Sequence, residues 1–293
     1  MVEYNKILWD AIDEKTTASE RSRARASFAK FRRMLNIDDE PRRCAPGVSP
    51  WLERIAAYMA LPLAVLAMFL LFHKENPVIW QSISTRPGQT TQIVLSDNTT
   101  IALNGGSTLV YPSHFSRRER QVFFSGEGYF EVYADPKHPF EVLTTDARIK
   151  VKGTKFNLKS YMDDQSVTVA LDEGKMAFEG DAHNAQHVQC EMVPGDNLSF
   201  NKETGTLKKN YSEADSGQWR RGEYYFRNET LGNISRDIER IFGVRVVVER
   251  EELLGTHYHI ALVNGETADD FVRILSLDKS LSVSREGNTI IIK

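Results

Sequence analysis

The chain has 293 residues, of which 41% are hydrophobic and 26% are charged, and this composition is typical of a globular protein and excludes wholesale disorder. The formal net charge of −3 at pH 7 gives no indication of a nucleic-acid binder that neutralises phosphates. A mean hydropathy of −0.40 excludes a protein with many membrane spans, and two cysteines are too few for a disulfide scaffold or a cysteine-rich metal site.

Residues 1–35 carry a helical pattern and form the first predicted domain. Ser19 is a candidate N-cap, and apolar residues follow it at steps of three and four. The apolar stripes of this head contain Leu8, Trp9, Phe28, Phe31 and Leu35. Two short helices bury too little apolar surface to be very stable alone. We therefore expect the stripes either to pack on each other as a helical hairpin or to contact a helix of a partner protein.

A linker and an apolar segment follow the head. Residues 36–54 contain three prolines and a glycine, which favours a linker. Residues 55–72 read IAAYMALPLAVLAMFLLF and carry no charge over 18 residues, a helical length of about 27 Å that is close to the thickness of a bilayer core. This pattern predicts a transmembrane helix over residues 55–73. The alternatives are a buried helix of a soluble domain and a cleaved signal peptide, but the latter would need a leader of 54 residues.

The basic residues beside the apolar segment predict its orientation. Arg42, Arg43 and Arg54 lie before it, whereas only Lys74 and Arg86 lie shortly after it. Cytoplasmic flanks carry the excess of Lys and Arg. We therefore expect the N-terminus in the cytoplasm and the residues after the span on the other side of the membrane. The two cysteines would then lie on opposite sides and would not pair within one chain.

Residues 86–210 change to a period of two and form the predicted β-rich body. Segments such as TQIVLS, TIALN, RQVFFSG, GYFEVYA and SVTVAL follow one another at intervals near ten residues. At least eight short strands indicate a barrel, a sandwich or a β-solenoid, and we favour a sandwich or a β-solenoid. The pair Asp97-Asn98 predicts a tight hairpin with Asn at positive φ. The segment Gly126-Glu127-Gly128 is interpreted as a turn between strands.

Residues 219–293 alternate strand and helix and form the last predicted domain. EYYFR, VRVVVE and HYHIALV read as strands, and Leu231, Ile234 and Ile238 form one helical stripe. Thr267 and Asp270 resemble a capping box, and LSVS with NTIIIK predicts a closing hairpin. We expect a two-layer domain of two similar strand–helix–strand units. The predicted fold is thus mainly β, with a small α+β C-terminal domain behind a helical head and a single transmembrane helix.

No pattern of catalytic or cofactor-binding residues is present. His183 and His187 lie four residues apart, but the segment HNAQH lacks the glutamate of a zinc protease. His257 and His259 share one face of a predicted strand without a third ligand. G-x-S-x-G, P-loop and dinucleotide fingerprints are missing. We expect no enzyme, no cofactor and no metal, although a carboxylate pair that meets only in space stays open.

Several segments resemble the FecR family of anti-sigma factors, in the form found in Bacteroidetes. Between residues 86 and 196 these are LSDNTTIALN, STLVYP, GEGYFEV, VKGTKFN and VPGD. GEGYFEV followed about 20 residues later by GTKFN is the more specific part. The tail, ending in GNTIIIK, is similar to the family's C-terminal domain, which is related to the short secretin/TonB-type module.

The resemblance implies a single-pass protein of the inner membrane that regulates transcription without touching nucleic acid. The head would bind an extracytoplasmic-function sigma factor in the cytoplasm. The periplasmic tail would contact the N-terminal signalling domain of a TonB-dependent outer-membrane transporter, as in the regulation of iron or glycan uptake. Because a lone helix has little bistability of its own, an intramembrane protease is a further candidate partner.

We expect the transporter contact at an edge strand of the tail, either residues 289–292 or residues 258–263, which would accept a partner strand. The residues assigned to this contact are Tyr258, Ile260, Ile290, Ile291 and Ile292. The alternative function is a membrane-anchored envelope protein with a structural role, or one that binds glycan or peptide, without contact to a sigma factor.

Overall fold

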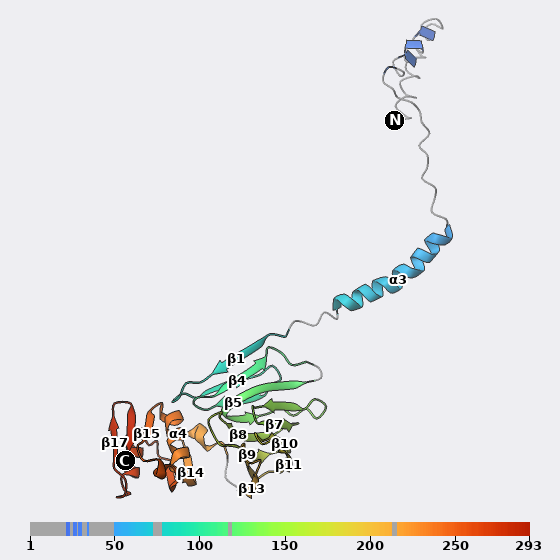
Figure 1. Cartoon of the computed structure of the whole chain (residues 1–293). Helices are drawn as coiled ribbons and strands as arrows, with labels where there is room; N and C mark the ends of the chain where they lie inside the picture. Colours follow the sequence, from blue (N-terminus) through green and yellow to red (C-terminus); the bar gives the residue numbers. More distant parts are fainter. Residues whose placement is uncertain are drawn as a thin grey trace. The chain divides into compact units, whose positions relative to one another are not determined.

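The computed structural model describes residues 22–23, 26–27, 29–30, 34, 50–72, 78–116, 119–212 and 216–293. The chain divides into two units, Met1–Glu75 and Asn76–Lys293. In the first unit, helix α3 runs over Pro50–Phe72 with Pro62 inside it (Figure 1). Among the residues just listed, no helix combines the length and the apolar character needed to cross a membrane. The span predicted over residues 55–73 is therefore not confirmed.

The second unit begins with a β-rich body of 13 strands joined by hydrogen bonds. Its strands are β1 (Trp80–Ser84), β2 (Thr91–Val94), β3 (Thr100–Leu103), β4 (Thr108–Pro112), β5 (Arg120–Glu131), β6 (Phe140–Leu143), β7 (Ala147–Val151), β8 (Lys155–Ser160), β9 (Ser166–Glu173), β10 (Met176–Asp181), β11 (His187–Met192), β12 (Asp196–Asn201) and β13 (Leu207–Tyr211). One sheet has the order β1-β4-β5-β6-β7-β10-β11, and the other has the order β2-β3-β5-β8-β9-β12-β13. All neighbours are antiparallel except β5 and β6.

Strand β5 belongs to both sheets and changes from one to the other at Gly126. Its first residues pair with β4 and β6, and its last residues pair with β3 and β8. Gly126 has a φ of 129°, and a Cβ there would lie 2.3 Å from Oγ of Ser107. The prediction of a turn at residues 126–128 is wrong, because the glycine bends one continuous strand between two sheets.

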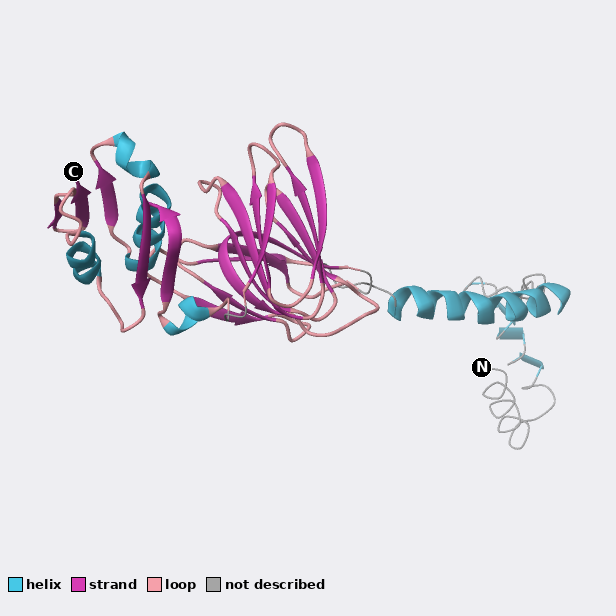
Figure 2. Cartoon of the chain, turned by 90° about the horizontal axis from the view of Figure 1, so that it is seen from below, coloured by secondary structure: helices cyan, strands magenta, loops and turns pink. Residues whose placement is uncertain are grey.

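The two sheets pack face to face over one apolar core, so the body is a sandwich rather than a solenoid (Figure 2). Alternate residues of each strand point inward, as the period of two predicts. The rings of Phe178 on β10 and Phe200 on β12 lie 5.7 Å apart and join the sheets. Phe130 and Phe156 stack at 4.9 Å within the core.

The predicted hairpin at Asp97-Asn98 is confirmed. Asn98 has a φ of 67°, a conformation that Asn adopts more readily than most residues. The Asp97 carboxylate accepts hydrogen bonds from the backbone N–H of Thr99 at 3.0 Å and from Arg120 at 2.9 Å. The turn is thus tied to β5 as well as to its own backbone.

The C-terminal domain has two small sheets and two helices. Its elements are the 3₁₀ helix η1 (Gln218–Arg221), β14 (Tyr224–Thr230), α4 (Leu231–Phe242), β15 (Arg245–Val248), the 3₁₀ helix η2 (Glu251–Gly255), β16 (His257–Leu262), α5 (Ala268–Leu275), β17 (Val283–Glu286) and β18 (Thr289–Ile292). β14 pairs with β16, whereas β18 lies between β15 and β17. The helix α4 contacts one strand of each sheet, β14 and β15.

The local signals of this domain are confirmed. Thr267 and Asp270 form a complete capping box at the start of α5. β17 and β18 form the closing hairpin. Leu231, Ile234 and Ile238 of α4 are buried in a second apolar core, separate from that of the sandwich. One face of α4 is therefore used within its own domain, which leaves its polar face for other contacts.

Candidate functional site

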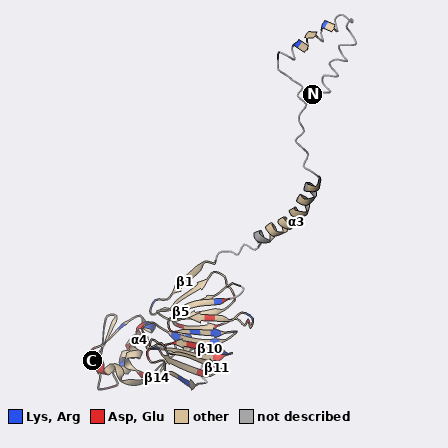
Figure 3. Cartoon of the chain, turned by 45° about the vertical axis from the view of Figure 1, so that its right-hand side comes forward, with Lys and Arg blue, Asp and Glu red and all other residues tan. Residues whose placement is uncertain are grey.

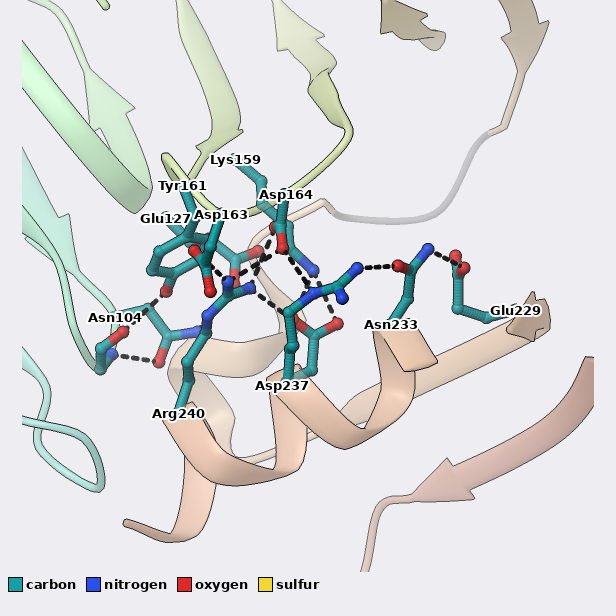
Figure 4. A network of polar contacts seen from close by, with 12 residues as sticks. Asn104, Glu127, Lys159, Tyr161, Asp163, Asp164, Glu229, Asn233, Asp237 and Arg240 are labelled. Carbon is teal, nitrogen blue, oxygen red and sulfur yellow. Dashed lines mark hydrogen bonds and ion pairs between the residues drawn. The ribbon is translucent and has the colours of Figure 1, made fainter. Parts of the chain in front are cut away.

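The polar face of α4 meets the turn between β8 and β9 of the sandwich (Figure 4). The helix starts at an N-cap, Thr230, whose side chain accepts a hydrogen bond from the backbone of Asn233. The helical period places Asn233, Asp237 and Arg240 away from the apolar stripe. We call the contact between this face and the sandwich the junction.

Arg240 lies at the centre of the junction. Its Nη2 lies 2.7 Å from a carboxylate oxygen of Asp163 and 2.9 Å from one of Asp164. Its Nη1 lies 3.0 Å from the second oxygen of Asp164 and 3.1 Å from Asp237 on its own helix. The side chains of Arg240 and Asp164 are only 10% and 12% exposed. A buried guanidinium thus joins carboxylates from both domains.

The aromatic ring of Tyr161 supports this guanidinium from the sandwich side. The Arg240 carbon Cζ lies 3.6 Å from the ring centroid, the geometry of a cation–π contact. The Tyr161 hydroxyl donates to the backbone carbonyl of Gly105 at 2.7 Å. Burial raises the pKa of the Tyr161 phenol, so it stays neutral and keeps donating.

The end of α4 also touches the backbone of two sandwich loops. The carbonyl of Arg240 accepts a hydrogen bond from the N–H of Gly88 at 2.8 Å. A Cβ on Gly105 would lie only 2.2 Å from the same carbonyl oxygen. This close approach requires glycine at position 105, and it fixes the helix end against the sandwich.

A polar pocket of about 240 Å³ adjoins the ion pairs. Nζ of Lys159 lies 2.7 and 2.6 Å from the two carboxylate oxygens of Asp237. The carboxylate of Glu127 accepts hydrogen bonds from the side-chain amides of Asn104 and Asn157 at 2.8 and 3.0 Å. The pocket therefore contains groups of both charges, and most of them already have partners.

The charges of the junction stabilise one another against burial. Burial disfavours charge on Asp164, but the hydrogen bond from Arg240 and the positive charge of Lys159 outweigh it, so the pKa of Asp164 is lowered. Burial also disfavours charge on Lys159, yet the carboxylates of Asp237 and Glu127 raise its pKa. Asp164 and Lys159 therefore both stay ionised near neutral pH.

The 3₁₀ helix η1 forms a second attachment between the domains. Nε1 of the buried Trp219 donates to Asn157 at 2.9 Å. The guanidinium of Arg220 lies 3.6 Å from the ring centroid of Tyr129 and pairs with Glu131 at 3.0 Å. The C-terminal domain is thus held to the sandwich at η1 and at the end of α4.

The arrangement joins two parts of the chain through buried paired charges. Within the described ranges, no group of three or more His, Cys, Asp or Glu side chains is placed to hold a metal ion. His183 lies between Asp146 and Glu203, and His187 contacts Asp181, all within the sandwich. Buried charge pairs specify a single orientation of the packed parts in some proteins, and we interpret the junction in this way.

The structure differs from the prediction for one of the two strands assigned to the transporter contact. β18 has a hydrogen-bonded strand on each side, so the prediction of an edge strand at residues 289–292 is wrong. Ile290 and Ile292 are buried in the core, and Ile291 is half-buried. Among the strands that the structure describes, none pairs with the second edge of β16. On β16, Ile260 is buried and Tyr258 is half-buried, with its hydroxyl 3.0 Å from Asp278.

The predicted sigma-factor contact lies outside the described residues. It comprises Leu8, Trp9, Phe28, Phe31 and Leu35. The junction itself was not predicted from the sequence. A usable signal was present, since an Asp-Asp turn and an Asp-x-x-Arg helix face are complementary in charge.

Comparison with family models agrees with this division of the chain. The model described as "FecR protein" matches residues 81–177, and the model described as "FecR, C-terminal" matches residues 223–292. Together the two stretches cover more than half of the 293 residues. Asp164 lies in the first stretch and Arg240 in the second, so the junction joins the two matched regions.

Solved structures are similar in fold. Two crystal structures of a putative anti-sigma factor from Parabacteroides distasonis ATCC 8503 match with 24% sequence identity and a TM-score of 0.67. The match covers 73% of this chain and 98% of the other. No curated protein sequence is significantly similar to the chain.

Proposed function

This chain belongs to the FecR family of anti-sigma factors, and we propose that it relays a signal from an outer-membrane transporter to a cytoplasmic sigma factor. The relay has three parts. The C-terminal domain receives the transporter's signalling domain, the segment at residues 55–73 crosses the inner membrane, and the head at residues 1–35 holds an extracytoplasmic-function sigma factor.

The observation that carries this proposal is the presence of both family stretches in one chain, joined by buried ion pairs. A force or a binding event at the C-terminal domain reaches the sandwich only if the joint between them is stiff. Arg240 and η1 provide such a joint, because each contact buries groups that lose their partners when the domains separate. The sandwich in turn leads directly to the proposed span.

The membrane topology rests on the sequence. The run from Ile55 to Phe72 without a charged residue supports a span, and the excess of Arg before it supports a cytoplasmic N-terminus. In cells, a reporter that works only in the periplasm should be active when it is fused after Lys293, and a reporter that works only in the cytoplasm should be inactive there. The chain should also resist carbonate extraction from membranes. A cytoplasmic reporter signal or release by carbonate would contradict this topology.

The head should retain the sigma factor through its apolar stripe. Removal of residues 1–54 should abolish co-purification of the sigma factor while residues 76–293 stay folded. Phe28→Asp should reduce co-purification by at least about tenfold, since an aromatic anchor carries much of such an interface. Phe31→Asp should act in the same way.

Ser27→Asp is the matched control for the head, because it adds the same charge next to Phe28 without removing an apolar side chain. Its retention of the sigma factor should equal that of the wild type. Full retention by the two Phe variants would exclude this stripe as the contact, and loss with Ser27→Asp would indicate a general charge effect.

For the transporter contact, the structure favours the sheet of β14 and β16, in place of β18. We propose strand addition at the free edge of β16, through its backbone. In a Cys190→Ser background, His259→Cys on β16 should cross-link to the transporter's signalling domain, whereas Arg285→Cys on β17 should not. Cross-linking at Arg285→Cys alone would move the contact to the other sheet.

A further inference from the structure

Exposed apolar side chains gather on the outer face of the sandwich near its first strand. Trp80 and Phe123 are both exposed, Trp80 at 49%. Their rings lie 5.5 Å apart, although 43 positions separate them in the chain. We call these two residues the Trp80 patch.

Strand geometry continues the patch across the sheet. On β5, Val122 and Phe124 point into the core, so Phe123 points outward. Its cross-strand neighbours on the same face are Val110 on β4 and Leu143 on β6. Figure 3 shows β1 without a charged residue, and its sequence WQSIS has none. An exposed aromatic pair with half-buried apolar neighbours on a sheet face favours a contact partner.

The chain position of the patch favours a lipid surface as that partner. Only residues 73–77 separate the end of α3 at Phe72 from Val78, and six backbone steps reach at most about 20 Å. If residues 55–73 span the membrane, Trp80 is thus confined to the vicinity of the lipid headgroups. Trp is enriched at that level, where its ring is apolar and its N–H stays hydrated.

The charge pattern around the patch is compatible with the same partner. Arg148 and Lys150 lie on β7, two strands from β5 on the same sheet, and both are exposed. Their side chains share the outer face, because Arg148 is opposite Leu143 in the β6–β7 pair. Carboxylates lie beside them, since Lys150 pairs with Glu141 at 2.8 Å and Arg148 is opposite Glu179 on β10. A face of mixed charge is compatible with lipid headgroups but is not by itself an argument for them, so the aromatic pair and its place in the chain favour the lipid surface.

We propose that the Trp80 patch binds the lipid–water interface, so that the sandwich rests on the bilayer from which the chain emerges. This inference rests on the proposed membrane span. It adds a function to the sandwich, which then senses its position relative to the membrane as well as carrying the C-terminal domain. A signal that tilts the sandwich would have to break this contact.

The test uses residues 76–293, which form a compact unit of their own. The crystallised Parabacteroides distasonis protein is covered over 98% of its length by 73% of this chain, which supports independent folding of this part. The fragment should float with vesicles of phosphatidylethanolamine and phosphatidylglycerol. The double variant Trp80→Ser with Phe123→Ser should bind about tenfold more weakly, because it removes two apolar rings from the contact.

Fluorescence gives a second readout from the same fragment. It contains two tryptophans, and Trp219 is only 6% exposed. A blue shift on addition of vesicles therefore reports Trp80. The matched control removes two exposed apolar side chains elsewhere, Tyr133→Ser with Leu277→Ser, and should float like the wild type.

Each outcome decides for or against the patch. The proposal is overturned if the fragment neither floats with vesicles nor shows a blue shift. It is also overturned if the control variant loses flotation as much as the variant without Trp80 and Phe123. Concentration-dependent dimers that the Trp80 and Phe123 substitutions abolish, without vesicle binding, would assign the patch to a second copy. The span is tested separately, by carbonate treatment of the full chain. If carbonate releases the full chain from membranes but the fragment floats with vesicles, only the span is refuted. If the full chain resists carbonate but the fragment does not float, only the patch is refuted.

Discussion

The two strand–helix–strand halves of the C-terminal domain start in the same way and end differently. Thr230 and Thr267 are the N-caps of α4 and α5. Six residues after each cap stands an arginine, Arg236 or Arg273, that bonds to the residue three positions before it. However, α4 has 12 residues and α5 has 8. The additional turn of α4 carries Arg240, whereas the corresponding position of the second half is Leu277, exposed at 80%.

This difference shows how a repeated unit acquires a second role. In both halves the apolar residues of the helix build the shared core, so the helix itself is explained by its own domain. Only the longer helix reaches the sandwich, where Arg236 and Arg240 pair with Asp164 and Asp237 pairs with Lys159. The docking contact thus uses the polar face of α4, and the apolar face of the same helix still builds the core of its own domain.

The largest expected difference between the halves concerns their arginines. Arg240→Ala should lower the free energy of unfolding of residues 76–293 by about 3 kcal/mol, because it removes a buried guanidinium that bonds to three carboxylates and stacks on Tyr161, although Arg236 and Lys159 still pair with two of them. Arg273→Ala should change it by less than about 0.5 kcal/mol, since the Arg273 side chain is 76% exposed. Urea unfolding followed by tryptophan fluorescence measures both.

Small-angle scattering sharpens the same comparison. Arg240→Ala should increase the radius of gyration of residues 76–293 if the junction holds the domains together, and Arg273→Ala should leave it unchanged. Equal destabilisation by the two substitutions would mean that the junction contributes no more than a surface ion pair.

A second comparison uses the close backbone approach at the end of α4. Gly105→Ala should destabilise the fragment by about 2 kcal/mol, because its Cβ overlaps the carbonyl of Arg240 and the helix end must move. Gly255→Ala is the control, since no atom lies within 4 Å of the added Cβ. Thermal unfolding of both variants measures the effect. If the Gly105→Ala protein is as stable as the Gly255→Ala protein, the loop that contains Gly105 can move away from α4 without a loss of stability.

The elements could be predicted from sequence wherever local chemistry decides them. The capping box at Thr267, the positive φ at Asn98 and the alternation of the sandwich strands all follow from residues close together in the chain. The junction could not be predicted in this way. Asp164 and Arg240 are 76 positions apart, and a charged helix face is ordinarily a solvent-exposed one.

Strand order was the other failure, and its physical reason is similar. The prediction for residues 289–292 treated the last strand of the chain as an edge, but hydrogen bonding placed it between β15 and β17. The run Ile290–Ile292 indicated a central strand, because three consecutive β-branched apolar residues are more typical of a strand covered on both faces than of an alternating edge strand. Neighbours in a sheet depend on packing of the whole domain, which a single strand does not encode.

Removal of the helix caps should lower the stability by a smaller amount, and here the second half of the domain should be affected more than the first. Thr267→Ala removes the hydroxyl that accepts from the backbone N–H of Asp270 and donates to its carboxylate, and it should lower stability by about 1 kcal/mol. Thr230→Ala removes a single hydrogen bond of 3.3 Å and should have a smaller effect. Chemical unfolding of both variants measures this ranking, and a larger loss for Thr230→Ala would indicate that its cap also supports the junction.

The last comparison of the two halves concerns the pH dependence of stability that Asp164 causes. This dependence is absent near neutral pH and appears only in acid. The pKa of Asp164 lies below the ordinary 3.8 although burial opposes the shift, because Arg240 and Lys159 favour the ionised form. The unfolded chain therefore takes up the proton first, so this stabilisation is complete above pH 3.8 and disappears as the pH falls through the lowered folded pKa. The stability difference between wild type and Asp164→Asn should accordingly be constant from about pH 7 to about pH 5 and shrink below about pH 4. Hydrogen bonds from the backbone and hydroxyl of Thr267 also lower the pKa of Asp270, but this side chain is 30% exposed against 12% for Asp164, so Asp270→Asn should show a weaker dependence in the same urea titrations. An Asp164→Asn difference that does not shrink in acid would mean that the Arg240 contact does not depend on the charge of this carboxylate.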